Sequence, residues 1–204
     1  MNARTDRRHQ DAAPGRRLFV AVPISESARD AVAAIVASVQ AAANPDARDV
    51  RWVRLDGLHL TLRFLGPTAE GAIADIAAAV NRTAGRIAPF DVVVGGAGAF
   101  PSVERPRALW LGVDEGGPEL AAAAAALDDE LASLGWPRSD RPFQAHLTLA
   151  RSDGVRSGPA VARRLIDAAR TVREPFRAEA LVLFESLSGE GRSRYVPLHE
   201  ARMG

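Results

Sequence analysis

One tetrapeptide, His-Leu-Thr-Leu, occurs twice in the chain, at residues 59–62 and again at 146–149. The 204 residues include four histidines and six threonines, so chance predicts about 0.1 His-x-Thr triplets. Side chains alternate between the two faces of a strand, so the histidine and threonine of each copy share one face and the leucines share the other. Each copy therefore predicts a strand that buries its leucines and presents an imidazole beside a hydroxyl.

The rest of the chain predicts helices and strands in nearly equal measure around these copies. Apolar residues recur at helical spacing in four segments, with Ser25 and Thr68 as N-caps of the first two: 25–42, 69–86, 118–134 and 159–171. Strand patterns occur at 17–23, 51–53, 58–65, 90–100, 107–113, 145–150, 176–186 and 193–198. Gly66-Pro67 is expected to end the strand 58–65. Because paired strands are often neighbours in sequence, we expect an α+β fold with largely antiparallel sheets.

The first residues differ in character from the rest. Residues 1–16 are polar and aperiodic, so we expect a disordered N-terminal tail, with a nucleic-acid-binding arm as the alternative. This stretch lacks the apolar core of a secretory signal, and no apolar run approaches the roughly 18–20 residues that cross a bilayer. We therefore expect a single domain over 17–204 that does not enter a membrane. Its expected oligomeric state is a monomer.

Two amino acids are missing, and each absence excludes chemistry. The chain has no cysteine, which excludes disulfides, thiol nucleophiles and Cys-ligated metal sites and is compatible with the cytoplasm. It has no lysine, which excludes P-loop nucleotide binding and Schiff-base catalysis. The all-arginine basic set and the alanine excess predict a GC-rich bacterial source. With a formal net charge of +1, any contact with nucleic acid should be local.

The two His-Leu-Thr-Leu strands, one in each half of the chain, can be brought face to face by an approximate two-fold axis. The cleft between them would hold two histidines, able to act as general base and general acid in one turnover. The hydroxyls could bond phosphate oxygens, which suits phosphodiester chemistry at a 2′-hydroxyl or a cyclic phosphate. The alternative is a structural role, in which each histidine is half-buried in its strand and bonded to the neighbouring threonine.

The extended motifs read His-x-Thr-x-x-Phe, ending at Phe64, and His-x-Thr-x-x-Arg, ending at Arg151. Here the chain resembles the two-histidine (2H) phosphoesterases, and within them the RNA 2′,3′-cyclic phosphodiesterases, historically called 2′-5′ RNA ligases. The resemblance extends over most of residues 17–200 and includes the segments Arg17–Ala21, Arg105–Trp110 and Tyr195–Leu198. Ala145 departs from the proline that usually precedes the second histidine.

The resemblance implies two pseudo-symmetric lobes around a central cleft, with helices on the outer faces. It implies hydrolysis of RNA 3′ termini that carry a 2′,3′-cyclic phosphate, giving 2′-phosphomonoesters, with no metal and no cofactor. His59 would be the proton donor to O3′, and His146 the proton acceptor that activates water. The phosphate would be held by Thr61, Thr148 and Arg151. The base would stack on Phe64.

Strict alternation, however, puts Phe64 and Arg151 on the faces opposite their histidines. To reach the cleft, each strand must bend, bulge or end within a residue or two after its motif. The role of three arginines near the first motif stays open, because Arg51, Arg54 and Arg63 could attract RNA phosphate or merely solubilise a sheet edge.

Other functions also fit the sequence. The same fold could act on small cyclic nucleotides, or join RNA ends reversibly through 2′-5′ linkages. A third alternative, from another class, is a catalytically idle RNA-binding module, against which both intact motifs and Arg151 argue.

Overall fold

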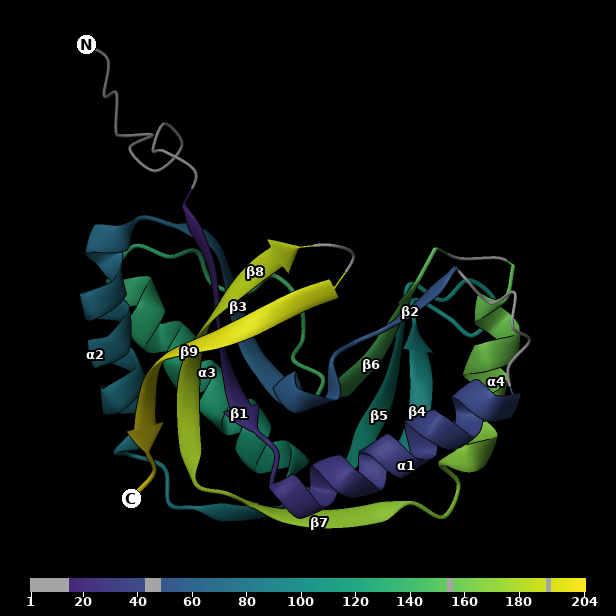
Figure 1. Ribbon diagram of the computed structural model, residues 1–204. Helices are drawn as coiled ribbons and strands as arrows, with labels where there is room; N and C mark the ends of the chain where they lie inside the picture. The colour runs from purple at the N-terminus through teal and green to yellow at the C-terminus, as the bar shows by residue number, and fades with distance from the viewer. Residues whose placement is uncertain (1–14, 43–48, 154–155, 190–191) are drawn as a thin grey trace.

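The computed structural model describes residues 15–42, 49–153, 156–189 and 192–204, so most of the expected tail lies outside the described residues (Figure 1). The strands are β1 (Arg16–Pro23), β2 (Val50–Trp52), β3 (His59–Thr68), β4 (Phe90–Phe100), β5 (Ala108–Glu115), β6 (Leu147–Ser152), β7 (Arg173–Ala178), β8 (Ala180–Gly189) and β9 (Arg192–Arg202). The helices are α1 (Glu26–Ala42), α2 (Ile73–Ala84), α3 (Gly117–Ser133) and α4 (Gly158–Ala168).

One sheet runs through both halves of the chain, in the order β7-β4-β5-β6-β3-β1-β8-β9, with β2 paired to β6. Its strand pairings among the described residues are antiparallel, which confirms the expected α+β class. The two motif strands, β3 and β6, are neighbours at the centre, and three further strands extend outward from each. The two expected lobes are therefore halves of one curled sheet, joined at the repeated motif.

The helices pack in two pairs on the two flanks of this sheet (Figure 1). Helices α2 and α3 pack together, α3 against β3 and α2 against β8 and β9, while α1 and α4 pack together against β7 and β4. Their buried faces follow the helical spacing, as in α1, where Val32, Val36 and Val39 are inside. Helix α1 follows β1 in sequence but covers the other half, so the two halves are interlocked.

The expected end of the strand at Gly66-Pro67 is wrong. Strand β3 continues to Thr68, with Gly66 in the left-handed region at φ 74° and both residues paired with β1. Thr68 is also not a helix cap, because its hydroxyl donates to the Gly66 carbonyl and α2 begins only at Ile73. Ser25 does cap α1, since its Oγ accepts from the Ala28 amide at 3.2 Å.

Two other boundaries also differ from expectation. The predicted strand 176–186 is two strands, β7 and β8, which separate at Glu179. Strand β7 was hard to recognise because it ends the sheet, and three of its six residues are charged. Near the N-terminus, the expected tail 1–16 is one residue too long, because Arg16 is the first residue of β1. Its guanidinium lies 2.6 Å from Glu185 and 3.1 Å from Glu70.

Candidate active site

A cavity of about 530 Å³ lies at the junction of the two motif strands, with walls from both halves of the sheet. It is lined by all of the predicted site residues: His59, Thr61, Phe64, His146, Thr148 and Arg151. The structure thus brings together side chains that are almost 90 residues apart in sequence.

The motif strands meet at a single pair of residues, Leu60 opposite Leu147. In an antiparallel pair this register turns each histidine toward the threonine of the other copy. His59 starts β3, whereas His146 lies just before β6 and not inside a strand as predicted. Because the ladder between the motif strands has only this one pair, the strands diverge around it and leave room for the cavity.

Both imidazoles are held by the same backbone contact. Nδ1 of His59 lies 2.7 Å from the Gly57 carbonyl, and Nδ1 of His146 lies 2.8 Å from the Gln144 carbonyl. A carbonyl can only accept, so each Nδ1 carries the hydrogen and donates it. In the neutral ring, Nε2 is then the atom left to exchange a proton. The structural alternative, a bond from each histidine to its neighbouring threonine, is wrong for both rings.

A β-bulge at the same point in each motif explains how the sixth residue reaches the cavity. The register of β3 with β1 skips Leu62, and the register of β6 with β5 skips Leu149. An extra residue reverses the alternation that follows, so Phe64 and Arg151 return to the face of their histidines. The predicted irregularity is confirmed, and it falls on the last residue of each tetrapeptide and not after it.

Aromatic rings surround His59. Its ring centroid lies 4.7 Å from that of Phe19 and 5.8 Å from that of Phe184, and Tyr195 meets it edge-on at 4.9 Å. Gly57 makes room for this packing, because a Cβ there would lie 2.9 Å from the Tyr195 ring. Burial lowers the pKa of His59 to about 4, opposed by the Gly57 carbonyl and aided by the nearby His146.

His146 has a more open setting. Phe100 meets it edge-on at 5.0 Å, and the Trp110 ring lies 6.3 Å away. Trp110 lies across Gly98, where a Cβ would come within 2.4 Å of the indole. Burial also lowers the pKa of His146, and the positive charge of Arg151 lowers it further. Both shifts favour the uncharged form of the two imidazoles at neutral pH.

The sixth residues of the two motifs, Phe64 and Arg151, are exposed on the cavity wall. Phe64 leaves 63% of its surface accessible, although its ring touches Phe19 at a centroid distance of 5.8 Å. Arg151 is exposed as well and has no acidic partner within the described residues. An open aromatic face and an unpaired guanidinium are suited to a ligand that carries both a base and an anionic group.

The three arginines near the first motif are all neutralised by carboxylates. Two pairs are exposed: Arg51 lies 3.1 Å from Asp153, and Arg54 lies 2.6 Å from Asp56. Arg51 also lines the cavity wall, together with Trp52. Neither Arg54 nor Arg63 is among the residues that line the cavity.

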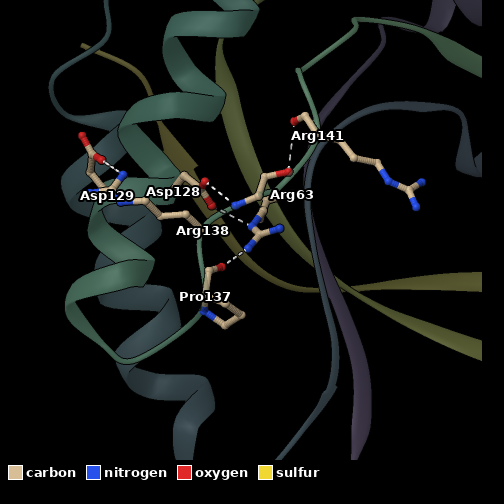
Figure 2. Close-up of polar contacts among 7 residues, drawn as sticks. Arg63, Asp128, Asp129, Pro137, Arg138 and Arg141 are labelled. Atoms are coloured by element: carbon tan, nitrogen blue, oxygen red, sulfur yellow. Dashed lines mark hydrogen bonds and ion pairs between the residues drawn. The ribbon is translucent and has the colours of Figure 1, made fainter.

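Arg63 projects to the helix side of the sheet, where its guanidinium lies 2.8 Å from Asp128 of α3 (Figure 2). It also donates to the carbonyl of Pro137, and Asp128 accepts from the Ser139 amide at 2.8 Å. The ion pair is only about 15% exposed. Arg63 neither faces the cavity nor serves as a surface solubiliser. It ties the first motif strand to the segment that leads into the second motif.

The sequence did not predict several cavity residues on β1, β8 and β9, the strands that extend the sheet outward from β3. Tyr195, Ser186 and Ser193 line the wall from β8 and β9, and Arg17 lines it from β1. The alternation of Arg17 and Phe19 along β1 could have indicated that they share the face of the cavity. Nothing local in the sequence could have placed Tyr195 against His59, since that contact depends on the turn at Gly57.

Metal-binding clusters and membrane-spanning helices are both absent from the described residues. They contain no cluster of three or more histidine, cysteine or acidic side chains placed to hold a metal ion. None of the helices in the described ranges is both long and apolar enough to cross a membrane.

Comparisons with known proteins point to one family. The family model of the 2′-5′ RNA ligase superfamily matches residues 24–190. An RNA 2′,3′-cyclic phosphodiesterase of Archaeoglobus fulgidus is 37% identical over 135 residues, 66% of this chain and 72% of that protein. One of Geobacillus stearothermophilus is 33% identical over 171 residues, 82% of this chain and 51% of that protein.

Solved structures give the same result. A Thermus thermophilus protein superposes with a TM-score of 0.72 at 26% identity, covering 92% of this chain and 97% of that one. Escherichia coli LigT in complex with 3′-AMP superposes with a TM-score of 0.69 at 25% identity, covering 92% and 98%. The fold thus has counterparts in two bacterial proteins of known structure.

Proposed function

The chain belongs to the 2′-5′ RNA ligase superfamily, and from this premise we propose that it opens RNA 2′,3′-cyclic phosphate termini to 2′-phosphomonoesters. The observation that carries the proposal is the convergence of both motifs on one cavity, with each imidazole held through Nδ1. Relatives from archaea and bacteria that bear the name RNA 2′,3′-cyclic phosphodiesterase support the same reaction.

The proposed step needs one proton removed and one supplied. Nε2 of His146 takes a proton from water as the water oxygen bonds to phosphorus. The bond from phosphorus to O3′ breaks, and Nε2 of His59 gives O3′ a proton. The product carries a free 3′-hydroxyl and a 2′-phosphomonoester, and both imidazoles regain their starting protonation states for the next turnover by trading protons with solvent. This assignment of donor and acceptor follows the family, since the repeat itself is nearly symmetric.

The low pKa of His59 sets a condition on this mechanism. An imidazole that donates a proton must be charged before the step, yet burial keeps His59 neutral near pH 7. We propose that the anionic cyclic phosphate provides the missing stabilisation, because a negative charge within a few ångströms raises the pKa of an imidazole. Arg151 would hold the same phosphate through its two-pronged guanidinium, and Thr61 and Thr148 would donate to its oxygens.

Phe64 is proposed to stack on the terminal base. Its ring is the most exposed large apolar side chain of the described residues, and stacking on a base would cover it. Because the complete residue set comes from a single chain, we propose that the enzyme acts as a monomer comprising residues 17–204. The cytoplasmic location and the bacterial source stay predictions.

A turnover assay tests the proposed function. A short RNA ending in a 2′,3′-cyclic phosphate should yield only the 2′-phosphomonoester, with the rate unchanged in EDTA. A free 2′,3′-cyclic mononucleotide tests the alternative of small-molecule hydrolysis. The cyclic-phosphate RNA mixed with a 5′-hydroxyl RNA tests the alternative of 2′-5′ joining. Loss of activity in EDTA with rescue by a divalent ion would overturn the metal-independent reaction, and binding without turnover would indicate an idle RNA-binding module.

A further inference from the structure

Resting on the proposed function, we infer that Arg17, with Ser186 and Ser193, forms a second phosphate site in the same cavity. It would bind the phosphodiester on the 5′ side of the terminal nucleotide. The enzyme would then distinguish an RNA end from a free cyclic mononucleotide. Neither His-x-Thr motif includes these three residues.

Arg17 faces the cavity because of its position in β1. Its neighbour Arg16 turns the other way, to Glu70 and Glu185. Alternation along the strand then puts Arg17 on the opposite face, where it lines the cavity and is exposed. Within the described part of the chain, Arg17 has no ion pair or hydrogen bond from its side chain. A free guanidinium on a cavity wall is available to an anion.

The charged residues that line the cavity around Arg17 favour an anion. The residues that line the cavity include three arginines but no aspartate or glutamate. Of these arginines, only Arg51 is occupied by a carboxylate. Ser186 on β8 and Ser193 on β9 line the same cavity. A guanidinium and serine hydroxyls are donors that a phosphodiester accepts from.

The distance from the reacting centre fits one nucleotide. Arg17 lies two residues from Phe19 on β1, about 6.8 Å along the strand. The Phe19 ring is in turn 4.7 Å from the ring of His59 and 5.8 Å from that of Phe64. Arg151, by contrast, is on β6 in the other half of the sheet. A base on Phe64 would therefore direct the reacting phosphate toward the histidines and the preceding phosphate toward Arg17.

The experiment compares kcat/KM for a dinucleotide and a mononucleotide, each ending in a 2′,3′-cyclic phosphate. The wild type should favour the dinucleotide by about tenfold, the size of one charge-assisted contact. Arg17→Ala should bring this ratio close to one. In Arg17→Ala, kcat/KM for the dinucleotide should also depend less on salt. The slope of log kcat/KM against log salt concentration should become shallower by about 0.7. Arg194→Ala is the matched control, because this exposed β9 arginine does not line the cavity and should keep the wild-type ratio.

Two results would overturn the inference. The first is a wild type with no preference for the dinucleotide. The second is an Arg17→Ala protein that keeps both the wild-type ratio and the wild-type salt slope. In each case hydrolysis itself persists, so the proposed function survives; no hydrolysis of any cyclic phosphate defeats both.

Discussion

The neighbourhoods of His59 and His146 share a backbone plan and differ in what packs on the imidazole. Both rings donate Nδ1–H to the carbonyl two residues earlier, and both motifs bulge at their fourth residue. Around His59, however, three aromatic rings close in, whereas Phe100 and Trp110 cover His146 more loosely. The shared plan places two equivalent nitrogens, and the unequal packing gives them different proton affinities.

The same contrast holds for the sixth residue of each motif. The bulge delivers an aromatic ring, Phe64, in the first half and a guanidinium, Arg151, in the second. One backbone device thus presents an exposed ring on one side of the cavity and an unpaired guanidinium on the other, which under the proposed function bind the base and the phosphate. The symmetry of the two motifs fixes where these groups lie, and the residue types at matching positions give them different chemistry.

The largest expected effect is the loss of either imidazole. His59→Ala and His146→Ala should each lower kcat by about 10²–10⁴-fold on an RNA cyclic phosphate, because each removes a proton-transfer group. Circular dichroism and thermal unfolding should show that both variants fold. His199→Ala is the control, since that ring bonds to Asn81 on α2 and should leave the rate unchanged. Wild-type rates in both motif variants would remove the histidines from the reaction.

The sixth residue of the second motif comes next. Arg151→Lys should lower kcat/KM by about 10²-fold, because a point charge cannot replace two parallel hydrogen bonds of about 1.5–3 kcal/mol each. Arg54→Lys, which alters an exposed arginine paired with Asp56, should have little effect. A lysine variant with the wild-type kcat/KM would show that Arg151 does not bind the phosphate bidentately.

The sixth residue of the first motif should matter less. Phe64→Ala should lower kcat/KM by about tenfold, chiefly through KM, because stacking of one base is worth about 1–3 kcal/mol. The matched control is Leu187→Ala, which trims the other exposed large apolar side chain of the described residues. A Phe64→Ala protein with unchanged KM for RNA would mean that the ring covers something other than the base.

The ion pair between Arg63 and Asp128, which ties the first motif strand to the segment before the second motif, should act mainly on stability. Arg63→Ala leaves Asp128 without its partner in a largely buried place, which should cost about 3 kcal/mol of unfolding free energy. Removing the exposed Arg138, which pairs with Asp129 a few residues away, should cost much less (Figure 2). Hydrogen exchange of residues 134–146 should also quicken in Arg63→Ala only. Equal stability of the two variants would contradict a stabilising role of the ion pair between Arg63 and Asp128.

Stability should also depend on pH, through the imidazole of His59. The pKa of His59 is about 4 in the folded chain and 6.5 when unfolded, so between these values the unfolded state binds more protons. Stability should therefore decline as pH falls from about 6.5 to about 4, and it should be fully present above that window. Chemical denaturation across this range should show a flatter profile for His59→Gln. An identical profile would mean that His59 is not buried as described.

Much of the molecule could be predicted from local pattern. The tetrapeptide indicated both motif strands, and Val32 and Val36 at helical spacing indicated α1. The demand that Phe64 and Arg151 face the cavity even required an irregular strand, which is the observed bulge. These succeeded because the side-chain period of a strand or helix is set by the backbone alone.

What could not be predicted depends on contacts between distant segments. Gly66-Pro67 looks like a stop, but pairing with β1 carries the strand through it. The charged edge strand β7 lacks an apolar alternation because one of its edges meets no other strand. The Tyr195 ring on His59 and the salt bridge between Arg63 and Asp128 join residues more than 60 positions apart, which no local pattern reveals.

The central claim, that two equivalent imidazoles divide into a donor and an acceptor, has a direct test in leaving-group chemistry. A cyclic phosphate in which sulfur replaces O3′ expels a thiolate, which needs far less protonation than a ribose oxygen. On this substrate His59→Ala should regain most of the wild-type rate, while His146→Ala should stay slow because water still needs its base. Recovery of His146→Ala with continued failure of His59→Ala would reverse the assignment, and recovery of neither would contradict acid catalysis by an imidazole.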